Sequence, residues 1–209
     1  MNQAEANRKK LILGAEVIQL LIPHRRPLIM VDGILAIARG EQPTLWAKRM
    51  ISVNEEIFAG HFPDMFLWPG IYTQEGMGQT CLLLQILEFF QDHWEKSGKD
   101  PEEILAALRN LEMKYRMHPG YRPENSACLE VFGSGPKGNP GMSGAVDLRF
   151  HEPVFGGQCL EYKVTKTHRM DNIVRFDVEA TVSGRLVANG RMTGVMKTPL
   201  PDLPQPNAR

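Results

Sequence analysis

Residues 70–90 carry many closely spaced apolar side chains. The apolar members of this stretch are Ile71, Met77, Cys81, Leu82, Leu84, Ile86, Leu87 and Phe90. They are too numerous for one face of a surface helix, and a helix that is apolar all round is buried. Pro69 suits a helix start, where its missing N–H costs nothing, and Gly76 and Gly78 would let another backbone come close. The pattern predicts a buried central helix held by a sheet.

Two shorter patterns precede this helix. Residues 8–22 are basic and then apolar, but Glu16 and Gln19 interrupt the apolar part, and no small-residue cleavage site of a secretory signal follows. We interpret the stretch as an amphipathic helix that Pro23 ends, because proline disfavours helix in the residue before it. Residues 44–53 mix apolar and charged side chains in a way that favours a strand.

The C-terminal half of the chain predicts mostly strands. After a polar stretch, we expect a helix at 101–111, strand-like pieces at 113–116 and 127–132, and a glycine- and proline-rich loop at 133–141. The strands expected beyond this loop lie at 145–150, 158–166, 173–182 and 185–197. Ser183 and Gly184 are the expected turn between the last two strands, and the gap before residue 173 predicts another hairpin.

Together these elements predict an α+β fold, in which a long central helix packs on a curved antiparallel sheet. The sequence lacks regular βαβ alternation and a glycine-rich nucleotide-binding loop. We expect one domain over residues 1–197. Residues 198–209 contain four prolines and are expected to form an extended, disordered tail.

The composition excludes several classes of function. Twenty-four basic residues balance 24 acidic ones, so the long-range positive field of a nucleic-acid-binding protein is missing. No apolar run approaches the ~18 residues that would span a bilayer. The three cysteines, Cys81, Cys128 and Cys159, are odd in number and far apart, without metal-ligand spacing. We therefore expect a reduced, cytoplasmic setting, no nucleic-acid partner and no membrane span.

Two titratable residues stand out for their surroundings. His61 lies in a turn flanked by Gly60 and Pro63, and Glu75 falls in the second turn of the central helix. A carboxylate among apolar residues is costly unless it is paired or protonated, and a raised pKa suits a general acid. Histidine can accept a proton from carbon, and the Gly70 N–H at the helix start can stabilise an enolate-like oxygen. Taken singly, a loop histidine is more often structural, and a glutamate near a helix start often only complements the helix dipole.

The string N-E-E-I-F-A-G-H-F-P at 54–63, followed by W-P-G at 68–70 and Glu75, closely resembles the active-site signature of the FabZ-type 3-hydroxyacyl-acyl carrier protein dehydratases of the hotdog superfamily. In that family a carboxylate follows the histidine by fourteen positions, and here 75 − 61 = 14. The segments 22–32 and 150–157 are similar to two further family motifs, with Gly157 where the family usually has aspartate. The resemblance covers residues of about 16–90 and 142–197.

The resemblance implies a hotdog fold and a homodimer or higher homo-oligomer, whose sites each take His61 from one subunit and Glu75 from the other. It implies that His61 is the base at the α-carbon, Glu75 the acid for the 3-hydroxyl, Gly70 the carbonyl donor through its N–H, and that Gln79 orients the carboxylate. The implied reaction converts (3R)-hydroxyacyl chains on acyl carrier protein to trans-2-enoyl chains, in fatty acid or related acyl-chain biosynthesis. Glutamate rather than aspartate at position 75 favours dehydration without isomerisation. No cofactor and no metal are expected.

The chain also departs from this family. Phe66 replaces a usual proline, and Trp68 and Tyr72 add bulk near the expected acyl tunnel, so these two and Phe62 are expected to contact the substrate. Residues of about 91–141 form an insertion whose role stays open. Three alternatives follow: a dehydratase dedicated to a polyketide or aryl polyene chain, a non-catalytic acyl-binding subunit, which a hotdog heterodimer could contain, and, more remotely, a thioesterase.

The other charged and histidine residues receive weaker assignments. His24, within the matched segment 22–32, is expected to cap or to hydrogen-bond rather than to react. Seven basic residues could form a rim that receives an acidic carrier protein, although most are expected simply to face solvent. They are Arg25, Arg26, Lys48, Arg49, Lys114, Arg116 and Arg122.

Overall fold

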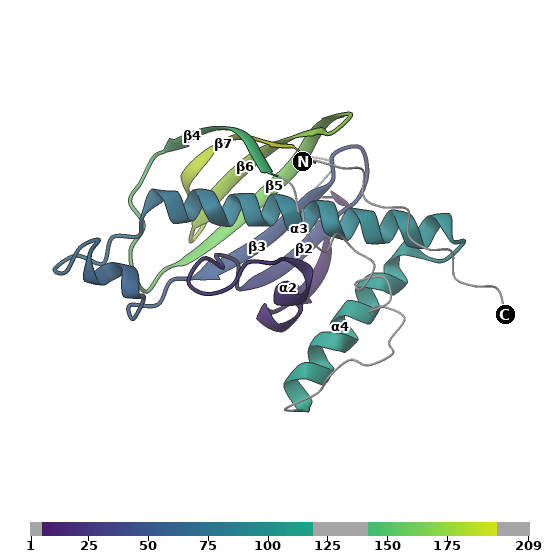
Figure 1. Ribbon diagram of the computed structural model, residues 1–209, viewed down its shortest axis with the longest axis horizontal. Coiled ribbons are helices and arrows are strands. Elements are labelled where there is room, and N and C mark those ends of the chain that lie inside the picture. Colours follow the sequence, from purple (N-terminus) through teal and green to yellow (C-terminus); the bar gives the residue numbers. More distant parts are fainter. Residues whose placement is uncertain (1–5, 119–141, 196–209) are drawn as a thin grey trace.

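The computed structural model describes residues 6–118 and 142–195. A seven-stranded antiparallel sheet wraps a long helix, α3, which lies across one face of the sheet (Figure 1). The strands are β1 (Lys9–Leu13), β2 (Gly33–Ala38), β3 (Thr44–Met50), β4 (Met142–Phe150), β5 (Cys159–Met170), β6 (Ile173–Val182) and β7 (Arg185–Val195), in the spatial order β1-β2-β3-β5-β6-β7-β4. The helices are α2 (Ala15–Leu21), the 3₁₀ helix η1 (Glu56–Ala59), α3 (Gly70–Lys96) and α4 (Pro101–Met117). This architecture confirms the α+β prediction of one long helix on a curved antiparallel sheet.

The central helix α3 begins at Gly70 as expected and continues to Lys96, beyond the predicted end at 90. Its last two turns look polar in the sequence, but Gln91 and Trp94 are buried there. Next to these buried residues, Asp92 and Glu95 face outward and bind Arg39 of the loop after β2. The prediction ended too early because the final turns of the helix bury a side chain at only every third or fourth position, so their sequence looks polar.

Inside α3, Gly76 and Gly78 lie against side chains of the sheet rather than against the backbone that the sequence suggested. A Cβ atom added at Gly76 would lie 2.2 Å from the hydroxyl oxygen of Tyr162, which projects from β5. At Gly78 the nearest atom would be Cε of Met192 on β7, at 3.4 Å. Gly76 is therefore the position where the helix makes room for the sheet.

The C-terminal strands confirm the expected alternation and hairpins. Along β6 buried and exposed residues alternate almost throughout, as they do in a strand with one face on the core. Ser183 and Gly184 join β6 to β7 with positive φ angles of 51° and 77°. The β5–β6 hairpin is tighter than predicted, because β5 extends to Met170 and turns at Asp171.

The prediction of one amphipathic helix over residues 8–22 is wrong in its first half. Residues Lys9–Leu13 form β1, which pairs with β2 and buries Leu11 and Leu13. Helix α2 begins only at Ala15. Strand β2 was absent from the prediction because its sequence, GILAIA, shows no alternation of apolar and polar residues. Five of its six residues are buried, since both faces of this strand are covered.

Helix α4 extends through residues 113–116, where the sequence suggested a strand. It begins with Pro101 behind Asp100, whose side chain accepts a hydrogen bond from the Glu102 N–H at 2.9 Å. Its apolar side packs against α3, β1 and α2. The predicted strand at 127–132, the loop at 133–141 and the tail at 198–209 lie outside the described residues.

Glu112 of α4 also closes the start of α2. Its Oε2 accepts a hydrogen bond from the Val17 N–H at 3.1 Å, and Arg116 pairs with its Oε1 at 2.7 Å. Residue 14 lies directly beneath this pair, and a Cβ there would meet Glu112 Oε1 at 2.4 Å. Because Glu112 is nearly buried beside Glu16, the pKa of its carboxyl is raised by burial and by the neighbouring carboxyl.

In the part of the chain that the structure describes, no helix is long and apolar enough to cross a membrane.

Candidate active site

His61 sits in a tight turn between η1 and α3. Its Nδ1 lies 2.8 Å from the carbonyl oxygen of Leu67. A carbonyl oxygen only accepts hydrogen bonds, so Nδ1 must carry the hydrogen and donate it. In the neutral ring, Nε2 then holds a free lone pair. The ring of Phe62 stacks on the imidazole, with a centroid distance of 4.4 Å. The turn thus presents His61 as a proton acceptor of fixed tautomer.

Gly70, the first residue of α3, lines the same cavity as His61, a hollow of about 350 Å³. The first N–H groups of an α-helix have no acceptor within the helix and carry partial positive charge. A Cβ atom at residue 70 would lie 3.1 Å from the ring of Phe150, at the end of β4. Glycine at this position keeps the helix start open to a carbonyl oxygen that needs a donor.

The aromatic residues expected near the acyl tunnel have different surroundings. Trp68 lines the His61 cavity but is only 3% exposed, packed between Phe58 and Tyr72. Tyr72 itself lines another hollow, of about 820 Å³, between α2 and η1. Phe62 is 45% exposed. Within one chain, Phe62 and Trp68 are therefore placed to meet a ligand near His61, and Tyr72 supports Trp68 from behind.

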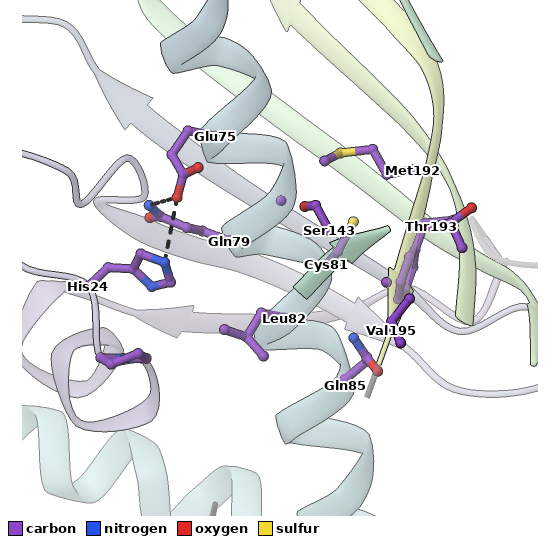
Figure 2. A pocket seen from close by; sticks show the side chains of 14 residues that line it. His24, Glu75, Gln79, Cys81, Leu82, Gln85, Ser143, Met192, Thr193 and Val195 are labelled. Atoms are coloured by element: carbon purple, nitrogen blue, oxygen red, sulfur yellow. Dashed lines mark hydrogen bonds and ion pairs between the residues drawn. The ribbon is translucent and has the colours of Figure 1, made fainter. Parts of the chain in front are cut away.

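Glu75 faces a second cavity, of about 220 Å³, on another side of α3 (Figure 2). Gln79, one turn further along the helix, donates from Nε2 to Glu75 Oε1 at 2.8 Å and to the Leu28 carbonyl at 2.6 Å. Its Oε1 accepts from the Met30 N–H at 2.8 Å. Three hydrogen bonds thus fix the amide of Gln79, which in turn orients the carboxyl. Glu75 is 34% exposed in the single chain.

His61 and Glu75 do not meet within one chain, because they line separate cavities with no lining residue in common. Gly70 accompanies His61, while Gln79 accompanies Glu75. Within one chain, each half of the expected site therefore lies in a cavity of its own.

Arg49, His24 and Arg116 have surroundings that the sequence did not reveal. Arg49 was a candidate for the basic rim, but it is only 12% exposed and binds Asp32 at 2.7 Å and Glu55 at 2.6 Å. It holds the Glu55 end of the matched motif against β3. His24 lies beside Glu75, a contact that sequence reasoning did not identify, because the two residues are 51 positions apart. Arg116, another candidate for the basic rim, pairs with Glu112 and Glu16. Arg122 lies outside the described residues.

Comparisons with known proteins show the family of the chain. A family model described as the FabA-like domain matches residues 22–132, more than half of the chain. The chain belongs to the FabA-like family. It is 30% identical over 118 residues to the 3-hydroxyacyl-[acyl-carrier-protein] dehydratase FabZ of Helicobacter hepaticus, a match that covers 54% of this chain and 69% of that protein. The FabZ of Granulibacter bethesdensis is 25% identical over 200 residues, covering 96% of this chain and 92% of that protein.

Among solved structures, the FabA-like chain is similar to the dehydratase heterocomplex ApeI:P from Xenorhabdus doucetiae, with a TM-score of 0.51. Sequence identity is 12%, and the match covers 87% of this chain and 91% of that one. At this identity the likeness shows the fold alone. It confirms the hotdog prediction, and the family model confirms the resemblance that the 54–75 motif indicated.

Proposed function

We propose that this FabA-like protein is a hydro-lyase that converts (3R)-hydroxyacyl thioesters on acyl carrier protein to trans-2-enoyl thioesters. The observation that carries the proposal is the hydrogen bond from His61 Nδ1 to the Leu67 carbonyl, in a cavity that the start of α3 also lines. It leaves Nε2 free to remove the α-proton, while the Gly70 N–H stabilises the charge that develops on the thioester oxygen. Glu75 then supplies the proton that turns the 3-hydroxyl into water. The named function of the FabZ relatives supports this reaction.

A direct assay tests the reaction. The purified protein is incubated with 3-hydroxyacyl chains on acyl carrier protein, and enoyl product is measured by mass spectrometry. Loss of a positioned acid–base group lowers the rate by about 10²–10⁴-fold, so His61→Ala is expected to fall by that factor. Full activity in His61→Ala would refute the role of His61. Absence of turnover by the wild-type protein, with activity only beside a second hotdog chain, would favour the non-catalytic subunit instead.

The complete site is proposed to form between two copies of the chain. Strand β4 lies at one end of the sheet, where among the described strands it pairs only with β7, and most of its residues from 143 to 150 are exposed. An edge strand with unpaired backbone groups invites pairing with another chain. Phe150, at the end of β4, packs against Gly70 at the His61 cavity, while Ser143, near the start of β4, lines the Glu75 cavity. Pairing two β4 strands antiparallel would bring unlike ends, and so unlike half-sites, side by side.

Mixed dimers test the shared site. In a dimer of one His61→Ala chain and one Glu75→Gln chain, one of the two shared sites has both native residues. Random assembly of a 1:1 mixture is then expected to restore about a quarter of wild-type activity. The matched control mixes wild-type chain with the double variant. Random 1:1 assembly leaves about a quarter of the dimers as wild-type homodimers, and in the mixed dimers neither shared site is intact, so the control is expected to show about a quarter of wild-type activity. A site within one chain would instead give about half of wild-type activity in the control and none in the His61→Ala with Glu75→Gln mixture, and that result would refute the proposal.

A second candidate keeps the chemistry but changes the acyl chain. The Glu75 cavity is lined by Gly78, Cys81 and Leu82, and further along by the polar Gln85 and Thr193. This mixture favours a dehydratase for a specialised polyketide- or aryl polyene-type chain over a purely aliphatic one. Turnover of chains that differ in length and unsaturation distinguishes the two, because a plain preference for short saturated chains would count against the specialised role.

A further inference from the structure

His24 is placed beside the proposed acid, although neither the motif nor the proposed reaction uses it. Its Nε2 lies 3.5 Å from Glu75 Oε1 (Figure 2). The residue follows Pro23, directly after α2, and both residues line the Glu75 cavity. Within the described ranges, His24 is the only charged or titratable side chain in ion-pair contact with Glu75. The contact joins two segments that are far apart in the sequence.

The surroundings of the imidazole decide where its hydrogen lies. His24 Nδ1 is buried and has no hydrogen-bond partner among the described residues. A hydrogen on Nδ1 would be a buried donor without an acceptor, and the Nε2 lone pair would then face the carboxylate oxygen. Nδ1 lacks a partner among the described residues in either tautomer, but with the hydrogen on Nε2 the ring presents an N–H to Glu75 and the repulsion between the lone pair and the carboxylate is removed. The neutral ring therefore carries its hydrogen on Nε2, the opposite tautomer to that of His61.

Two donors thus converge on one oxygen of the carboxyl. Gln79 Nε2 lies 2.8 Å from Glu75 Oε1, and His24 Nε2 approaches the same atom. An oxygen that accepts a hydrogen bond from Gln79 and faces the His24 Nε2 at 3.5 Å is poorly suited to carry a hydrogen of its own. The proton of the neutral acid is therefore directed to Oε2, the oxygen that neither donor contacts.

We propose that His24 is a positioning residue for Glu75, an inference that rests on the proposed dehydration. In that step the Glu75 Oε2–H bond breaks as the proton passes to the 3-hydroxyl, the C3–O bond breaks, and water leaves. The α-proton goes to His61, and its electron pair forms the C2=C3 double bond. The carboxylate that remains accepts a hydrogen bond from Gln79 on Oε1, and His24 Nε2 lies 3.5 Å from the same atom. His24 acts through Glu75 and touches no reacting atom.

Two variants separate positioning from packing. The Nε2 of a glutamine can occupy the place of the histidine Nε2 and donate, whereas phenylalanine keeps the ring size and removes the donor. A hydrogen bond to a charged group corresponds to a change in rate of about 10–100-fold. We expect His24→Phe to lower kcat by at least about tenfold with KM nearly unchanged, and His24→Gln to retain most of the wild-type kcat. Equal losses in both variants, or full activity in His24→Phe, would overturn the inference.

A measurement without turnover keeps the inference testable if the reaction differs from the proposed one. In wild-type protein with ¹⁵N-labelled histidine, the imidazole shifts of His24 are expected to report hydrogen on Nε2, with His24→Gln used to assign the signals. Hydrogen on Nδ1 would overturn the positioning role whatever the substrate is. If the wild-type protein turns over no hydroxyacyl thioester but shows the Nε2–H tautomer, the proposed function fails and the contact to Glu75 stands.

Discussion

Gly76→Ala offers a sharp test of how tightly α3 is fitted to the sheet. The added methyl would lie 2.2 Å from Oη and 2.4 Å from Cζ of Tyr162, far inside van der Waals contact. Tyr162 is 1% exposed, so its ring cannot swing into solvent. Overpacking of a core costs about 1–3 kcal/mol, while replacing glycine by alanine within a helix returns up to about 1 kcal/mol. We expect a net loss of about 1–2 kcal/mol in the free energy of unfolding.

Gly78→Ala is the matched control on the same helix. Its methyl would meet only the flexible end of Met192, at 3.4 Å, an ordinary contact distance. The helix-propensity gain of up to about 1 kcal/mol is then unopposed, so Gly78→Ala is expected to stabilise slightly or to be neutral. Urea unfolding followed by circular dichroism, at one fixed protein concentration, compares the two variants.

The clash predicts a coupling between residues 76 and 162. Tyr162→Leu removes the end of the ring, and a methyl at residue 76 then partly fills the space that is left. The double variant is therefore expected to be more stable than the sum of the single changes predicts, by about 1–3 kcal/mol. Strict additivity, or a Gly76→Ala variant as stable as Gly78→Ala, would refute the claim that Tyr162 is the reason for the glycine.

Two further predictions concern charged groups outside the proposed site. Burial raises the pKa of Glu88 above its ordinary value of 4.5 despite its ion pair with Lys166. Since the folded protein favours the protonated carboxyl, the contribution of Glu88 to the free energy of unfolding is lost as pH rises above about 4.5 through the raised pKa. Glu88→Gln should flatten this decline with pH, measured by urea unfolding across that range. An unchanged slope in Glu88→Gln would contradict this assignment. Asp100→Ala removes the hydrogen bond to the Glu102 N–H and is expected to cost about 1 kcal/mol, seen as faster hydrogen exchange at the start of α4 but not in α3.

The sequence predicted the elements whose partners are local. The start of α3 at Gly70 and the β6–β7 turn at Ser183 follow from proline and glycine chemistry within a few residues. The failures have a common physical cause, which is tertiary contact. Residues 9–13 have no strand pattern of their own and become β1 only by pairing with β2, and residues 113–116 stay helical because α4 packs on α2, β1 and α3.

The proposed site shows the same division. The 54–75 motif predicts His61, Gly70 and Glu75 as site residues from their spacing along the chain. It did not show that His24 and Gln79 converge on one oxygen of Glu75, because the Glu75–His24 contact joins residues 51 positions apart. The position of Glu75 on the side of α3 away from His61 depends on the rotation of the helix, which the sheet fixes.

The contact between Glu112 and the start of α2 constrains which residue can stand at position 14. Glycine at position 14 leaves the space that Glu112 Oε1 and Arg116 Nη2 occupy, since a Cβ there would lie 2.4 Å and 2.2 Å from these atoms. A side chain at residue 14 would therefore displace the Glu112–Arg116 pair of α4, so we expect residue 14 and the insertion of about 91–141 to vary together. Across the family, we expect a glycine at this position in chains that carry the insertion of about residues 91–141, and freely varying residues in chains that lack it.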